Sequence, residues 1–149
     1  MIGRGKEVRH RRVFSENEAS YLAESFLGRL ATASPEGEPH VVPVSYRFDG
    51  RTITFGGWNL TSSLKYRHLT ANDRVAFVVD DVLSVDPWRV RGVEVRGRAE
   101  PMTVDGVSMV RIIPLEVRSF SGIITPTGEL VFADNWDEAG SGSQNEEMT

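Results

Sequence analysis

The sequence of 149 residues contains no cysteine. Disulfide bonds, iron–sulfur clusters, thiolate zinc sites and cysteine nucleophiles are therefore excluded. No apolar run approaches the roughly 18 residues of a membrane-spanning helix, and the basic segment 1–13 has no apolar stretch behind it that would make a signal peptide. Motifs of metalloproteases, serine hydrolases and phosphate-loop enzymes are missing as well. We therefore expect a cytoplasmic protein that does not bind membranes.

Lysine is scarce: the sequence has only two lysines, Lys6 and Lys65, but fifteen arginines. The formal net charge of −4 arises at the end of the chain, where five acids from Asp134 onward have no basic neighbour. Residues 1–133 hold 16 acids and 17 bases, so they create no broad positive field that would attract nucleic acid. The three histidines are far apart and show no metal-ligand spacing. Neither a nucleic-acid partner nor a metal site is predicted.

The chain is predicted to be one domain between two tails. Its length suits a single core. Residues 1–13 lack periodicity and are expected to form a mobile basic arm. Residues 137–149 are polar and rich in Gly and Ser, which predicts a disordered acidic tail. The folded domain, which is expected to hold the binding site, is then predicted at 14–136.

Two helices are predicted. Ser15 with Glu18 forms a capping-box pattern that begins a helix at about residue 16, and Gly28 ends it after residue 27. A second helix is expected at 61–71, from apolar residues at helical spacing.

The rest of the chain is typical of short antiparallel strands. Asp49-Gly50 indicates a two-residue hairpin turn, and residues 80–90, which include Pro87, are expected to form a loop. Pro114 indicates either an edge strand or a bulge. Strands are expected at 29–34, 40–48, 51–55, 75–79, 93–98 and 110–117, with a last hairpin within 120–132. Consecutive strands with tight turns favour a mainly β fold, a six-stranded antiparallel barrel with two short helices.

The segment 56–74, GGWNLTSSLKYRHLTANDR, carries the strongest local signal. A strand ends in two glycines, and a Ser/Thr cluster with Ser62 and Ser63 precedes a helix that has Lys65 in its first turn. A helix N-terminus presents free N–H groups and a partial positive charge, so these parts predict a phosphate site. The alternative is ordinary N-capping by Thr61 or Ser62, with Lys65 in solvent.

Two further features allow a flat ligand, and each has an ordinary explanation. Pro43 interrupts the expected strand 40–48, so it lies either at a free edge or against a bound group. Trp88 stands beside Arg89 in the expected loop and either covers a flat ring or packs as a partly exposed aromatic.

In combination, four pieces of the sequence resemble the pyridoxamine 5′-phosphate oxidase-like split-barrel family, and more narrowly its flavin/deazaflavin oxidoreductase branch. They are LATASPEGEPHVVPVSYRFDG, TFGGWNLTSSLKYRHLTANDRVAFVVDD, DPWRVRGVEVRGRAE and VRIIPLEVRSF, which cover roughly residues 15–120. The resemblance implies an FMN-binding type of split barrel that forms a homodimer with cofactor sites at the interface. It does not extend to residues 121–149.

The resemblance also implies where a cofactor binds. The ring is expected along the strand at His40, Pro43 and Val44, the phosphate near Ser62, Ser63 and Lys65, and Tyr66 and His68 beside the site. Trp88 and Arg89 are expected to reach the site from the partner subunit. Members use FMN or coenzyme F-420, and some bind haem or bilins.

The leading prediction is an enzyme that transfers a hydride between F-420 and a small conjugated organic substrate. An FMN-dependent oxidase or reductase, and a non-catalytic carrier of flavin, haem or bilin, are the alternatives. Because the cofactor supplies the reactive carbon in such chemistry, no catalytic acid or base is assigned, and Tyr66 and His68 are only candidates.

Overall fold

The computed structural model describes residues 14–136, so the predicted arm at 1–13 and tail at 137–149 lie outside the described residues. The elements follow one another as α2 (Glu16–Glu24), β1 (Leu27–Ala33), β2 (Pro39–Ser45), β3 (Arg47–Phe48), β4 (Ile53–Phe55), η1 (Leu60–Ser62), α3 (Leu64–Ala71), β5 (Arg74–Val85), β6 (Trp88–Val104), β7 (Val107–Ile124) and β8 (Leu130–Asp134).

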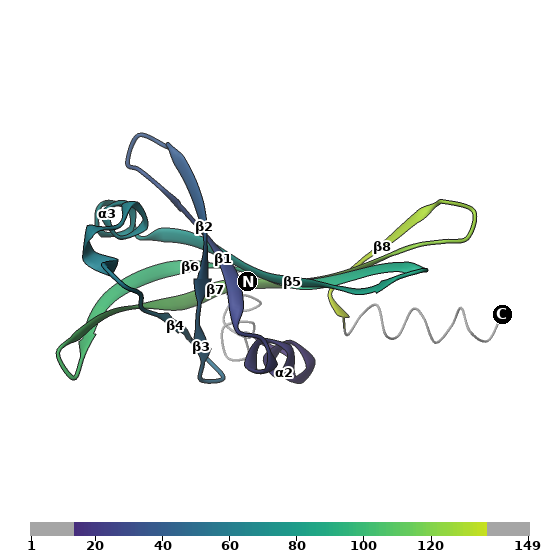
Figure 1. Cartoon of the computed structure of the whole chain (residues 1–149), viewed down its shortest axis with the longest axis horizontal. Helices are drawn as coiled ribbons and strands as arrows, with labels where there is room; N and C mark the ends of the chain where they lie inside the picture. Colours follow the sequence, from purple (N-terminus) through teal and green to yellow (C-terminus); the bar gives the residue numbers. More distant parts are fainter. Residues whose placement is uncertain (1–13, 137–149) are drawn as a thin grey trace, which may run out of the picture.

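The strands form one antiparallel sheet that curves around the core (Figure 1). Its order is β2-β1-β5-β6-β7-β4-β3, and β8 pairs with the outer half of β7. The predicted mainly β architecture with two short helices is confirmed, with eight strands in the described part instead of six. Neither helix of residues 14–136 is long and apolar enough to cross a membrane.

The predicted loop at 80–90 is wrong, because β5 and β6 continue through it and are joined by a turn at Asp86-Pro87. The two adjacent acids of this segment, Asp80 and Asp81, are neutralised within the sheet. Asp80 pairs with Arg29 of β1, and Asp81 accepts a hydrogen bond of 3.0 Å from Nε of Arg91. A carboxylate with a cation beside it on the sheet surface is compatible with a strand.

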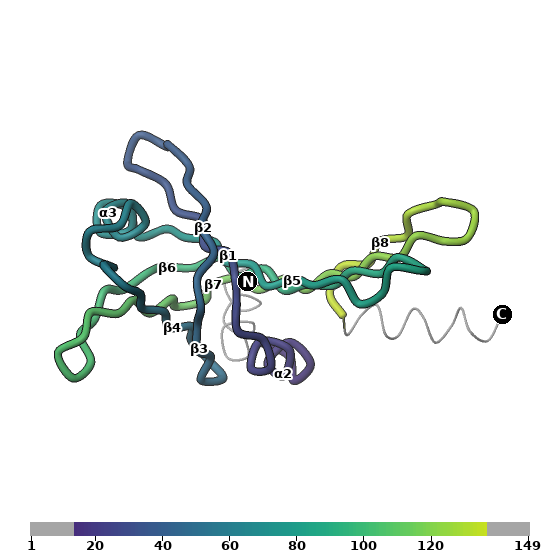
Figure 2. The backbone as a smooth tube through the Cα atoms, in the orientation of Figure 1, coloured from purple at the N-terminus to yellow at the C-terminus, as the bar shows by residue number. Residues whose placement is uncertain are grey.

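The extended halves of β5, β6 and β7, together with β8, form a β arm that projects from the barrel on the side away from α3 (Figures 1 and 2). The last hairpin was predicted correctly, and it turns at Thr125–Glu129. This arm is the main part of the architecture that the sequence pattern did not predict.

Both helices end differently from the prediction. The capping box of Ser15 and Glu18 is confirmed, but α2 ends at Glu24 and β1 already begins at Leu27. The predicted second helix is divided, because Ser63 has extended backbone between η1 and α3.

The turn between β3 and β4 spans four residues, not two. The carboxylate of Asp49 accepts hydrogen bonds from the backbone N–H of Arg51 and Thr52, at 2.8 and 2.6 Å, and from the Thr52 hydroxyl at 2.8 Å. Partial burial opposes ionisation, but the hydrogen bonds outweigh it and hold the pKa of Asp49 below its ordinary value. The side chain therefore fixes a longer turn than the Asp-Gly pair predicts.

Pro114 marks a bulge, and it also lies where β7 has a strand partner only on the β6 side, because β4 pairs with β7 at residues 110–112 and β8 at residues 120–124. The register shifts between Arg96 and Gly97, and Gly97 faces Pro114. A Cβ at Gly97 would lie 2.1 Å from the Ile113 carbonyl oxygen, so only glycine allows this close approach.

The core lies inside the curved sheet and is closed by α2 and α3. Its largest fully buried side chains are Phe55, Phe77, Leu22, Leu30, Ile53, Leu69 and Ile112. The Tyr46 ring packs edge-on against Phe77, with centroids 5.2 Å apart, and its hydroxyl donates a 2.7 Å hydrogen bond to the Leu22 carbonyl. Tyr46 thereby connects α2 to the barrel.

Candidate cofactor-binding site

The strand pair β1–β2 and helix α3 bring together two of the predicted site residues. Thr32 on β1 is paired with His40 on β2, and His68 of α3 lies over them. The Thr32 hydroxyl and Nδ1 of His68 form a buried 3.0 Å hydrogen bond. The His40 ring stands edge-on to the His68 ring, with centroids 5.9 Å apart. His68 therefore turns its ring toward the sheet, and its predicted place beside a cofactor stays a prediction.

The N-terminus of α3 is capped by Ser63, and not by Thr61 or Ser62 as the simpler interpretation had it. The Ser63 hydroxyl accepts a 3.3 Å hydrogen bond from the Tyr66 N–H and donates one of 2.6 Å to the Leu60 carbonyl. Both hydrogen-bonding roles of this hydroxyl are thus used within the protein. The exposed hydroxyl of Ser62 is not committed in this way.

Lys65 lies in the first turn of α3, where a cation opposes the helix dipole. No carboxylate of residues 14–136 lies within ion-pair distance of its ammonium group. The side chain is half-buried. An unpaired cation at a helix N-terminus is an arrangement that a bound anion would stabilise.

Helix α3 is held on the barrel by both apolar and polar contacts. Leu69 is fully buried, and Tyr66 is half-buried against the core. The Asn72 side chain donates a 3.3 Å hydrogen bond to the Ala33 carbonyl of β1. The segment with Ser62 and Lys65 is therefore attached to a defined place at the end of β1.

Strand β2 is an edge strand of the described sheet, which agrees with the free-edge interpretation of Pro43. Pro43 is exposed and pairs with Arg29, whereas Val44 points inward and is buried. Pro43 brings no N–H to this edge, and its partner Arg29 lies near the start of β1, whereas α3 is attached at Ala33, where β1 ends.

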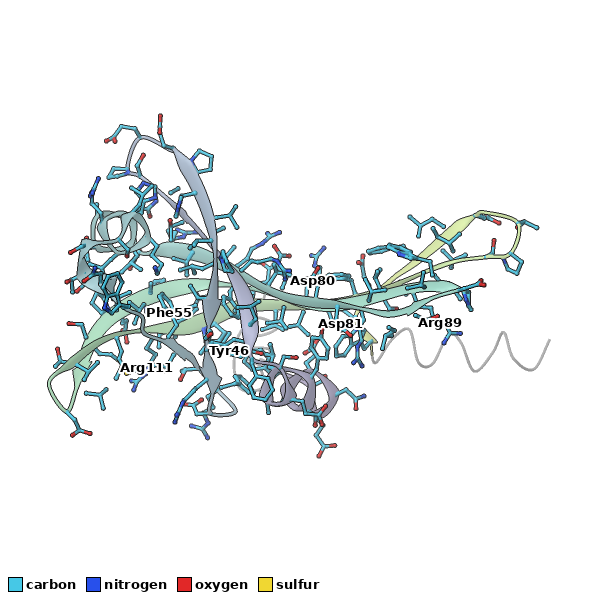
Figure 3. All side chains as sticks on the ribbon, viewed as in Figure 1. Tyr46, Phe55, Asp80, Asp81, Arg89 and Arg111 are labelled. Atoms are coloured by element: carbon cyan, nitrogen blue, oxygen red, sulfur yellow. The ribbon has the colours of Figure 1, made fainter. Side chains whose placement is uncertain are left out.

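Trp88 does not lie in a loop. It is the first residue of β6, is 37% exposed and lies on the β arm. Its neighbour Arg89 lies on the projecting part of the arm, far from the end of the barrel that carries α3 (Figure 3). Within one chain, the structure does not bring Trp88 and Arg89 to Lys65.

The sequence did not predict an open groove on the outer face of the sheet. It is lined by small side chains from neighbouring strands and by charged residues of both signs, namely Ala31, Ala33, Ala76, Arg74, Arg96 and Glu116. The groove encloses about 520 Å³, a volume within the usual range of small-molecule sites. The alternation Ala31-Thr32-Ala33 is its only sequence signal, with alanines outward and Thr32 toward His68.

A family model covers most of the chain and shows which protein family it belongs to. Residues 14–121 match the family model described as pyridoxamine 5′-phosphate oxidase. The chain belongs to this family. The family resemblance seen in the sequence is therefore confirmed, and so is the predicted split-barrel fold.

Individual relatives of this pyridoxamine 5′-phosphate oxidase family member are similar over most of the barrel. A 5a,11a-dehydrotetracycline/5a,11a-dehydrooxytetracycline reductase from Streptomyces rimosus is 45% identical over 95 residues, which are 62% of this chain and 67% of the relative. A solved F-420 reductase is 26% identical with a TM-score of 0.56, and the match covers 70% of this chain and 98% of that one. An FAD-binding protein from Mycobacterium smegmatis, 19% identical with a TM-score of 0.60 over 74% and 97% of the two chains, shares the fold.

The residues present fit a phosphate-bearing ring cofactor of the flavin type. Lys65 has no ion pair among residues 14–136, the Ser62 hydroxyl is exposed, and both lie at the start of α3. Nδ1 of His40 is buried and has no hydrogen-bond partner in the described part of the chain. Because buried polar atoms are nearly always satisfied, this nitrogen is available to a group that the protein binds.

Proposed function

We propose that this protein is an oxidoreductase that transfers a hydride between coenzyme F-420 and a small conjugated organic substrate. The observation that carries the proposal is the 45% identity to a dehydrotetracycline reductase, a protein named for a reduction. The likeness to an F-420 reductase supports the choice of deazaflavin. By the same comparison, we propose the direction from reduced cofactor to substrate.

In this proposal, the start of α3 holds the cofactor phosphate. Lys65 supplies a full positive charge, the Ser62 hydroxyl supplies a donor, and the first N–H groups of α3 point the same way. Ser63 keeps these groups in place through its cap, and Tyr66 supports them from the core side. Pro43, with Val44 behind it, forms the edge along which the ring lies, and His40 offers a nitrogen for its orientation.

The reduced cofactor supplies the hydride when it is bound, and the protein supplies position and a dry environment. The chain's own residues bind the phosphate, orient the ring and exclude water. No side chain is assigned as an acid or base, because the cofactor supplies the reactive carbon in this chemistry.

An FMN-dependent oxidase or reductase is the second candidate. It is favoured by the family description, which names an oxidase, and by the fold shared with an FAD-binding protein. FMN also carries a phosphate, so the same residues at the start of α3 would bind it.

We also propose that the protein works as a homodimer through the outer face of its β arm. Val82, Val90, Gly122 and Phe132 form one row across the four strands of the arm. Phe120 stacks on Phe132, with centroids 5.9 Å apart. Exposed apolar side chains of this face are Val82, Val85, Trp88, Leu130 and Phe132. An apolar sheet face of this extent is typical of a protein interface.

The barrel half of the same outer face carries charges that are self-complementary. Arg96 lies 3.3 Å from Glu94 and 4.0 Å from Glu116, and Arg118 lies 3.8 Å from Glu116. Two cations and two anions can meet the same set on a second copy related by a two-fold axis. In such a dimer, Trp88 and Arg89 belong to the partner's side of the site.

An anaerobic assay tests the proposed reaction. The full-length protein is mixed with reduced F-420 and 5a,11a-dehydrotetracycline, and the return of oxidised cofactor absorbance is followed. We expect turnover that depends on both components and falls in Lys65→Ala. Turnover with reduced FMN but not with reduced F-420 would replace the first candidate by the second, and no turnover with either would contradict an enzyme for this substrate class.

A further inference from the structure

The Thr32–His68 pair is a buried polar contact between β1 and α3. Thr32 is 4% exposed and His68 is 8% exposed, and each satisfies the other. Replacing both partners of such a pair with apolar groups of similar shape is often nearly neutral for folding. A hydrogen bond differs from an apolar contact because it has a direction, so this pair fixes an orientation.

The element whose orientation it fixes is α3, which has only eight residues. A helix of two turns is marginal on its own, so its tertiary contacts decide where it lies. Leu69 attaches its apolar side, and Asn72 attaches its C-terminal end to Ala33 of β1. His68 attaches its middle to the adjacent residue of the same strand, and thus sets the rotation of the helix about its axis.

That rotation determines where Lys65 lies. Lys65 and His68 are three residues apart, so their side chains leave neighbouring positions on the helix surface. A rotation by about 20° moves an atom at the helix surface, some 5–6 Å from the axis, by about 2 Å. A hydrogen bond between an ammonium group and a phosphate oxygen tolerates only a few tenths of an ångström.

From these contacts we infer that Thr32 and His68 are positioning residues, which place Lys65 for the anion at the start of α3. The His40 ring, edge-on to His68, keeps the imidazole from turning away. This inference rests on the proposed function in one respect, the identity of the anion as the phosphate of a cofactor.

A double-mutant cycle of Thr32→Val and Lys65→Ala in the full-length protein tests the inference. Fluorescence titration gives the dissociation constant for F-420, and for FMN in parallel. In the parent background, Thr32→Val is expected to weaken binding by about two- to tenfold, the range of one hydrogen bond. In the Lys65→Ala background the same change should have less than about a twofold effect, because the group being positioned is gone. Equal factors in both backgrounds would overturn the inference.

Two substitutions of His68 refine the test. Asn places a polar atom where Nδ1 of histidine lies, and Gln places one where Nε2 lies. His68→Asn is therefore expected to keep most of the affinity, and His68→Gln to lose it as Thr32→Val does. If both His68 variants lose the same affinity, and both also have a lower melting temperature, the pair is merely structural. Thr70→Val removes an exposed hydroxyl of the same helix and serves as the control.

Amide hydrogen exchange of the cofactor-free protein keeps the inference separate from the proposed function. We expect Thr32→Val to speed exchange in α3 while β5–β7 keep their parental rates. Failure of the parent to bind F-420 or FMN would contradict the proposed function alone, and the exchange result would still decide on the positioning of α3. Unchanged exchange in α3 would contradict the positioning.

Discussion

The substitution Lys65→Ala separates a phosphate-binding cation from an ordinary surface lysine. Lys65 has no ion pair within residues 14–136, so its loss should change the free energy of unfolding by no more than about 0.5 kcal/mol. A charge-assisted hydrogen bond to a phosphate contributes roughly 1.5–3 kcal/mol. Because each 1.4 kcal/mol corresponds to tenfold in affinity, cofactor binding should weaken by about ten- to a hundredfold.

The assay is fluorescence titration with F-420 and with FMN at low and at high salt. Screening weakens a cation–phosphate contact, so the parent's affinity should fall as ionic strength rises, and that of Lys65→Ala should fall less. Arg67→Ala is the matched control, because Arg67 is exposed on the same helix but two residues away and on a different side. Equal affinities of parent and Lys65→Ala, together with equal salt dependence, would refute the placement of the phosphate.

Three other predictions concern the barrel and the arm. Gly28→Ala should lower the free energy of unfolding by about 1–3 kcal/mol and the melting temperature by several degrees, because its Cβ would lie 2.1 Å from the Phe77 ring. Gly56→Ala is the control and should be tolerated, since the atom nearest to its Cβ would lie at 3.7 Å. Equal melting temperatures of the two variants would contradict this. Burial raises the pKa of Tyr46 to about 12. Its contribution to stability is complete below the ordinary tyrosine value near 10 and is lost as pH rises toward about 12, so the urea midpoint of the parent should fall more steeply over that window than that of Tyr46→Phe. In light scattering, the parent should have twice the chain mass of 16.6 kDa, and Phe132→Asp should have the mass of one chain. Val107→Asp, at the opposite end of the molecule, is the control and should stay dimeric. A parent with the mass of one chain would contradict the dimer.

The barrel was predictable because its signals are local. The capping box at Ser15 and the short antiparallel strands depend on residues close in sequence, and the structure has both. The last hairpin, which belongs to the arm, was predicted for the same reason. The β arm was missed because the strand character of 80–90 depends on distant partners. Asp80 and Asp81 are neutralised by Arg29 and Arg91, and only the folded sheet brings these charges together.

The candidate site was predictable in part. The sequence indicated a helix N-terminus with Lys65 in its first turn, and α3 has it. The hydrogen bond between Thr32 and His68 joins residues 36 positions apart, and no motif signals it. Trp88 was assigned to the wrong kind of element, because a tryptophan beside Asp86-Pro87 is typical of a loop as well as of a strand that begins after a tight turn.

We propose that this member of the pyridoxamine 5′-phosphate oxidase family binds a flavin-type redox cofactor and prefers F-420. Parallel titrations of the full-length protein with F-420, FMN and haem, followed by cofactor fluorescence and absorbance, test it most directly. We expect saturable binding of one F-420 per chain and weaker binding of FMN, with both affinities reduced by salt. Binding of haem alone, or no saturable binding of F-420 or FMN, would contradict it.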